Sequence, residues 1–123
     1  MKPASVVVFA TSGPEAPRRT ATPFDMATIA ATMDCEAEMI FQMDGALLMK
    51  KGVPDKLFPP GHESPLSELI SAAKQAGVKL SVCSAALKLN VMSGDDLIDA
   101  CDGIVGAAYI ADRALEADLV LCY

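Results

Sequence analysis

The residue best placed to do chemistry is Cys83, which stands in the segment Lys79-Leu80-Ser81-Val82-Cys83-Ser84-Ala85-Ala86-Leu87-Lys88. An apolar run typical of a buried strand ends at this cysteine, and a run of helix-favouring residues follows it. The first backbone N–H groups of a helix have no partner within the helix and carry the positive end of its dipole, so they stabilise a thiolate. The position therefore predicts a nucleophilic thiol at a strand-to-helix turn.

The competing interpretation of Cys83 is a buried structural thiol, since free cysteine is among the most buried residue types. The other cysteines favour that interpretation: Cys35 precedes a strand, Cys101 falls on the inward face of an expected helix, and Cys122 falls in an apolar final strand. The four cysteines show no C-x-x-C pair and no disulfide-framework spacing. Each is therefore expected to be a free thiol in a reducing compartment.

Two turns are expected beside Cys83, because the crevice of an open parallel sheet lies outside the carboxyl ends of its strands. They are Thr11-Ser12-Gly13 after the first strand and Gln42-Met43-Asp44-Gly45 after the second. His62 lies in a Pro-rich loop and is either a solvated loop residue or, if the loop folds over the crevice, an aid to thiolate formation. The candidate neighbours of the site are Thr11, Ser12, Gly13, Asp44, His62 and Ser84.

The segments that position these residues alternate between strand and helix patterns. This alternation predicts a three-layer α/β/α fold with a mainly parallel five-stranded sheet, in a single domain over residues 1–123. The expected strands cover residues 6–10, 38–43, 78–82, 104–106 and 119–123. Helices are expected near residues 22–33, from Ser64-Pro65 to Gly77, over 84–89, from the Ser93-x-x-Asp96 capping box past Cys101, and over 107–116.

An apolar patch, Ala46-Leu47-Leu48-Met49, lies between the second strand and a loop at residues 50–63 that is rich in proline and glycine. Left in water, this patch and the neighbouring methionines would form an unusually large apolar surface. The sequence therefore predicts a homo-oligomer that buries either this patch or the neighbouring methionines between subunits.

Charge and hydropathy bound the class of partner. The net charge of −6 argues against nucleic acid or an anionic membrane as the main partner. Acidic residues interrupt every apolar stretch before it reaches the ~20 residues that span a bilayer. The first residues hold no long apolar region of the secretory type, so we expect a cytoplasmic location and no association with membrane.

Several segments follow one pattern: residues 77–86 around the cysteine, the acidic Asp95-Asp96-Leu97-Ile98, residues 106–110, and residues 117–121. Together they resemble the DsrE/DsrF/TusD family of small sulfur-relay proteins. In that family a cysteine after the third strand is followed by small residues, an acidic helix, a glycine, a further helix and a last apolar strand. Upstream, residues 40–52 are similar to the family's second strand and the segment after it.

The resemblance implies a sulfur carrier in which Cys83 holds a persulfide, with a possible sulfurtransferase-type activity. A thiolate attacks a sulfane sulfur, the Cys83 persulfide forms, and an acceptor thiolate repeats the exchange. The resemblance also implies a rhodanese-like sulfur donor, a TusA-like acceptor and a homo-oligomer of three or more subunits. Neither a metal nor a cofactor is expected.

Two other functions remain open. A thiol redox sensor would use Cys83 with a second cysteine within a few ångströms. A flavodoxin-like module for a small ligand would instead use the turn at residues 11–13, with Arg18 and Arg19 beside it to bind an anion.

Overall fold

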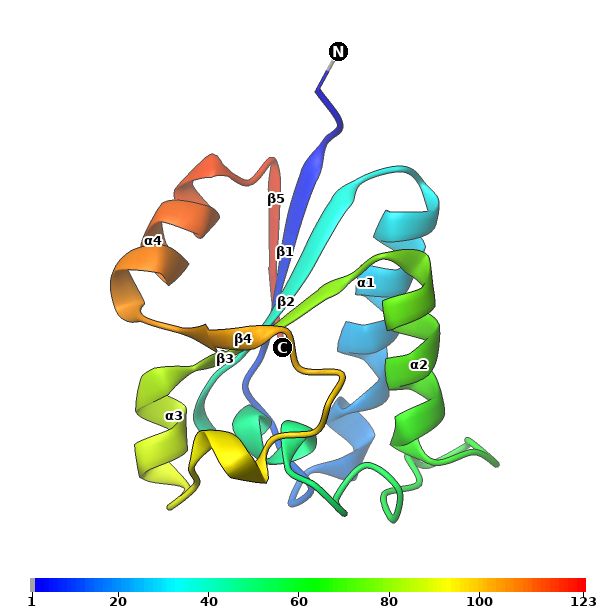
Figure 1. Ribbon diagram of the computed structural model, residues 1–123. Helices are drawn as coiled ribbons and strands as arrows, with labels where there is room; N and C mark the ends of the chain where they lie inside the picture. Colours follow the sequence, from blue (N-terminus) through cyan, green and yellow to red (C-terminus); the bar gives the residue numbers. More distant parts are fainter. Residues whose placement is uncertain (1) are drawn as a thin grey trace.

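The computed structural model describes residues 2–123 and contains one sheet of five strands with helices on both faces (Figure 1). The strands run in the order β4-β3-β2-β1-β5, and every neighbouring pair is parallel. This arrangement confirms the expected three-layer α/β/α fold. The strands are β1 (Ser5–Ala10), β2 (Glu36–Phe41), β3 (Lys79–Cys83), β4 (Gly103–Val105) and β5 (Leu119–Cys122).

The helices form two unequal layers. Helices α1 and α2 cover one face of the sheet, α4 covers the other, and α3 lies at the carboxyl edge together with three short 3₁₀ helices (Figure 1). The α-helices are α1 (Ala21–Thr32), α2 (Leu66–Ala76), α3 (Ser84–Leu89) and α4 (Ala107–Glu116). The 3₁₀ helices are η1 (Pro17–Arg19), η2 (Met43–Met49) and η3 (Gly94–Asp96).

The core is large on the α1/α2 face and small on the α4 face. Residues from β1, β2 and β3 alternate between the two faces, as the period of a strand requires. The large cluster holds Phe24, Leu66 and Ile70 from the helices, packed on alternate residues of the three strands. The small cluster consists of Val7, Phe9, Ile40 and Ile110. Only one α4 side chain, that of Ile110, is buried among the ten that the structure describes there.

The edge strand β5 is covered only in part: Leu121 packs against the large cluster, but the other residues of the strand are exposed. Leu119 and Val120 point to opposite faces and remain 48% and 40% exposed. Strands of parallel sheets are usually covered by helices on both faces, so this edge leaves apolar surface in water.

The helix expected from Ser93 past Cys101 is wrong beyond Asp96. The Ser93 and Asp96 side chains do form the expected capping box, but it heads only the 3₁₀ helix η3. Leu97 then pairs with Lys50 in an antiparallel bridge, and the Ile98 N–H donates to the Met49 carbonyl. Backbone bonds to this distant segment replace the bonds that would have continued a helix.

Several other boundaries differ from expectation by one or two residues, and two of these differences have a visible cause. β2 ends at Phe41, two residues early, because Met43 adopts φ 53° and begins η2. α1 begins at Ala21 rather than at residue 22, with Thr20 in the N-cap position, and the Thr20 hydroxyl donates to the Pro17 carbonyl at 2.8 Å.

The apolar segment at residues 46–49 does not form a surface patch. Ala46, Leu48 and Met49 are fully buried within the subunit, where η2 folds them into the large cluster. The expectation that this segment is buried between subunits is therefore wrong, because no exposed apolar surface is left there to bury.

Candidate functional site

Cys83 lies where the sequence places it, at the end of β3 and at the start of α3. It is the last residue of the strand and the N-cap residue of the six-residue helix Ser84–Leu89. In the sheet its register partner is Val105 of β4. The side chain is half-buried and packs against both apolar clusters. Strand pairing and apolar packing thus fix the position of Cys83, while part of the residue stays accessible to solvent.

A cavity of about 420 Å³ opens beside Cys83. Its walls come from the turn after β2 and from α3, and the lining residues are Gln42, Met43, Cys83, Ala85, Ala86 and Leu89. None of these six residues carries a charge. Met43 and Leu89 are 59% and 57% exposed, so the mouth of the cavity is apolar and open to solvent. The walls of the cavity beside the Cys83 thiol are therefore uncharged.

The structure brings the two predicted turns together, and the second turn reaches the cavity at Cys83 through Gln42 and Met43. A Cβ atom at Gly13 would collide with the Asp44 carbonyl, so the first turn lies directly against the second. The Thr11 hydroxyl donates to the Tyr123 carbonyl at 2.6 Å and thus ties the first turn to the end of β5. Four of the predicted neighbours do not line this cavity: Thr11, Ser12, Gly13 and Asp44.

The two remaining predicted neighbours differ in position. Ser84 follows Cys83 directly as the first residue of α3 and is exposed. His62 is exposed in the loop before α2, where its Nδ1 atom lies 3.4 Å from the Pro60 carbonyl oxygen. That loop lies at the foot of α2, across the molecule from α3 (Figure 1). The loop does not fold over Cys83, and His62 takes no part in its surroundings.

The other cysteines have different environments, and all four thiols are free. Cys101 is half-buried, and burial raises the pKa of its thiol, with the neighbouring Asp102 carboxylate acting in the same direction. Desolvation thus disfavours the thiolate form of Cys101. Cys122 was expected in an apolar strand but is exposed, because it lies on the edge strand β5, most of which is exposed.

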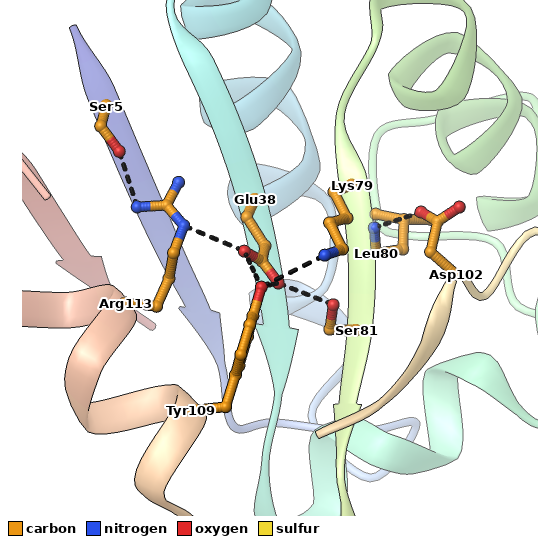
Figure 2. Close-up of polar contacts among 8 residues, drawn as sticks. All are labelled: Ser5, Glu38, Lys79, Leu80, Ser81, Asp102, Tyr109 and Arg113. Atoms are coloured by element: carbon orange, nitrogen blue, oxygen red, sulfur yellow. Dashed lines mark hydrogen bonds and ion pairs between the residues drawn. The ribbon is translucent and has the colours of Figure 1, made fainter. Parts of the chain in front are cut away.

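A buried carboxylate on the α4 face was not predicted. Glu38 of β2 is only 2% exposed, and both of its carboxylate oxygens accept hydrogen bonds (Figure 2). The Ser81 hydroxyl donates to Oε2 at 2.7 Å, and Arg113 Nε donates to Oε1 at 3.0 Å. The Tyr109 hydroxyl lies 2.9 Å and 3.0 Å from the two oxygens. We call these four residues the Glu38 network.

The Glu38 network fastens α4 to the sheet. Tyr109 and Arg113 are four residues apart, so they lie on one face of α4, and that face meets Glu38 (Figure 2). Arg113 Nη1 also donates to the Ser5 hydroxyl at 2.6 Å, which extends the network to β1. Lys79 donates to the Tyr109 hydroxyl at 3.2 Å; this bond and the charge of Glu38 raise the pKa of Lys79. Through these contacts the network holds α4 against β1, β2 and β3.

Residue patterns signal the Glu38 network only in part. A glutamate inside an apolar strand needs a buried partner, and that need is visible in the segment Glu38-Met39-Ile40-Phe41. Its cationic partner lies 75 residues further along the chain. No local pattern identifies Arg113 as that partner.

Among residues 2–123, no group of three or more histidine, cysteine, aspartate or glutamate side chains is arranged to hold a metal ion. Over the same residues, no helix combines the length and apolar character needed to cross a membrane.

Comparison with known proteins gives a family and a fold. The sequence profile of the DsrE/DsrF-like family matches residues 4–123. The chain is similar in structure to the ychN protein from E. coli, with a TM-score of 0.79 and 18% identity over all of both chains. It is also similar to MTH1491 from Methanobacterium thermoautotrophicum, a protein of unknown function, with a TM-score of 0.67 and 19% identity over 98% of this chain and 99% of that one. No curated protein matches the chain significantly.

Proposed function

The chain belongs to the DsrE/DsrF-like family, and from that premise we propose that it is a small cytoplasmic sulfur carrier whose Cys83 accepts sulfane sulfur and passes it on. Family membership supports a sulfur-relay-type role. The observation that carries the finer proposal is the half-buried Cys83 at the mouth of an open, uncharged cavity on the carboxyl edge of the sheet.

The proposed chemistry is two thiol exchanges. The Cys83 thiolate attacks the outer sulfur of a donor persulfide; the S–S bond of the donor breaks, a new S–S bond forms on Cys83 Sγ, and the donor leaves as a thiolate with the bonding electron pair. An acceptor thiolate then attacks the outer sulfur of the Cys83 persulfide and releases the Cys83 thiolate. The sulfur changes carrier without net oxidation, so the sequence of exchanges needs no metal or cofactor.

The surroundings of Cys83 suit both exchanges. The open mouth between Met43 and Leu89 admits a partner sulfur, while half-burial limits the access of other thiols that would discharge the persulfide. The backbone N–H groups at the start of α3 follow Cys83 directly, and such groups favour an anionic sulfur. We propose a rhodanese-like donor and a TusA-like acceptor, and a single domain that assembles into a homo-oligomer of three or more subunits.

Intact-mass spectrometry tests the proposal. After incubation with a sulfane-sulfur donor, the native chain should gain the mass of one sulfur, and peptide mapping should place it on Cys83. Cys83→Ser should gain none, whereas the matched control Cys101→Ser should load like the native chain, since the Cys101 thiol has a raised pKa. Sulfur carried by another cysteine would refute the proposal. Formation of a disulfide from Cys83 in place of a persulfide would favour the redox sensor.

A further inference from the structure

One side chain joins the two walls of the cavity at Cys83. Asn90 follows the last turn of α3, and its Nδ2 amide donates to the Met43 carbonyl at 2.9 Å and to the Ala86 carbonyl at 2.8 Å. Met43 belongs to the wall after β2, and Ala86 belongs to the wall formed by α3. The amide of Asn90 therefore ties together two segments that are 47 residues apart in sequence.

The Met43 end of this tie holds a backbone conformation that L-residues rarely adopt. Met43 has a φ of 53°, in the left-handed region. A residue other than glycine stays there only when its surroundings hold it. Burial does not hold Met43, because its side chain is 59% exposed. The hydrogen bond from Asn90 to its carbonyl supplies the restraint that burial does not.

The chain that follows α3 holds a similar backbone conformation. Val91, directly after Asn90, has a φ of 54° and is 93% exposed. Its conformation turns the chain back, so that the Met92 N–H reaches the Leu87 carbonyl at 2.8 Å. The turn fixes the end of α3 from which Asn90 reaches across to Met43. Met43 at one end of the tie, and Val91 directly after Asn90 at the other, thus both have left-handed backbone conformations.

We propose that Asn90 is a positioning residue for Cys83: by holding Met43 in its left-handed conformation, it fixes the cavity wall and the approach to the thiol. This inference rests on the proposed function in taking Cys83 as the carrier thiol. Without the Asn90 donor, Met43 relaxes toward an ordinary backbone conformation and its side chain leaves the mouth of the cavity. The walls then no longer discriminate by size among the molecules that reach Cys83.

The test measures alkylation of Cys83 by a small reagent, iodoacetamide, and by a bulky one, fluorescein maleimide. The rate ratio of small to bulky reagent should fall roughly fivefold in Asn90→Ala, which is the population shift that one net hydrogen bond supports. Asn90→Asp keeps the shape but cannot donate, so it should behave like Asn90→Ala. Lys88→Ala, on the exposed surface of the same helix, is the matched control and should keep the native ratio. Alkylation of the half-buried Cys101 in the same samples reports any global loosening.

Met43→Gly separates positioning from packing, because glycine adopts the left-handed conformation without strain. In that background Asn90→Ala should lower the melting temperature less than it does in the native chain. Unchanged alkylation ratios in both Asn90 variants would overturn the inference, as would a loss of stability that is equal in the two backgrounds. Sulfur loading by intact mass is measured alongside: if the native chain fails to load, the proposed function fails, while the alkylation ratios still decide the role of Asn90.

Discussion

The Arg113→Ala substitution removes the guanidinium that pairs with the buried Glu38 carboxylate. The Glu38 side chain is 3% exposed and the Arg113 side chain 15%, so little water is present to replace the lost charge. Removing one partner of a buried ion pair costs about 3–5 kcal/mol, because the remaining charge stays uncompensated. Tyr109 and Ser81 still donate hydrogen bonds to Glu38, which puts the expected loss near 3 kcal/mol.

For a chain of this length, each kcal/mol corresponds to roughly 4 °C of melting temperature, so Arg113→Ala should lower it by roughly 12 °C. Urea unfolding gives the free energy of unfolding directly. If its slope against urea concentration is the same in the variant and the native chain, the two unfolding transitions can be compared. Lys74→Ala is the matched control, since Lys74 and Asp102 form an ion pair in which both side chains are 32% exposed. Exposed pairs contribute ~0–1 kcal/mol, so this control should change stability little.

A second variant isolates the reason for the loss. Glu38→Gln in the Arg113→Ala background replaces the unpaired buried charge by a neutral amide, so the double variant should be more stable than Arg113→Ala alone. If Arg113→Ala costs less than ~1 kcal/mol, or if the double variant is no more stable than the single one, pairing with the Glu38 charge does not fasten α4 to the sheet.

Two further predictions concern pH and assembly. Partial burial of Asp102 opposes its charged form, but hydrogen bonds from the Leu80 N–H and from Lys74 outweigh this effect and lower the pKa of Asp102. The charged carboxylate therefore stabilises the fold at pH values above the ordinary pKa of 3.8, and this stabilisation is lost as the pH falls through the lowered pKa. The difference in unfolding free energy between the native chain and Asp102→Asn should therefore shrink as the pH falls below 3.8, and a growing difference would contradict the sign. Light scattering should report that the native chain is a homo-oligomer. Val120→Lys on the edge strand β5 should dissociate this oligomer, whereas Val91→Lys, at a site that is 93% exposed, should leave it intact. A monomeric native chain would refute the assembly.

Local signals predicted much of the fold. The helical spacing of Leu66, Ile70 and Ala73 predicted α2, and Gly77 ends it with a φ of 99° as expected of a C-terminal glycine. The expected ranges of α3 and α4 coincide with the observed ones. In each of these segments the apolar pattern and the end signals agree, so the local preference and the tertiary structure point the same way.

The observed structure differs from the expected one where contacts between distant segments determine the local conformation. The capping box at Ser93 favoured a full helix, but the Ile98 N–H bonds to Met49 instead. Likewise Cys83 and the turn that carries Met43 could be placed side by side from the sequence, but the hydrogen bond from Asn90 to Met43 joins residues whose contact no local pattern predicts. A sequence pattern reports what a segment prefers, and these contacts report which distant partner it finds.

The sheet face that carries Cys83 divides into two regions with different roles. Toward the amino end, Ser81 and Lys79 alternate with buried residues of β3, and both belong to contacts around the Glu38 carboxylate (Figure 2). There Arg113 and Lys79 are engaged with groups of their own subunit. At the carboxyl end, the cavity beside Cys83 has no charged lining residue. A small anionic sulfur donor would thus find no cation in that lining to bind it, and apolar contact at Met43 and Leu89 favours a partner that brings apolar surface along with its sulfur.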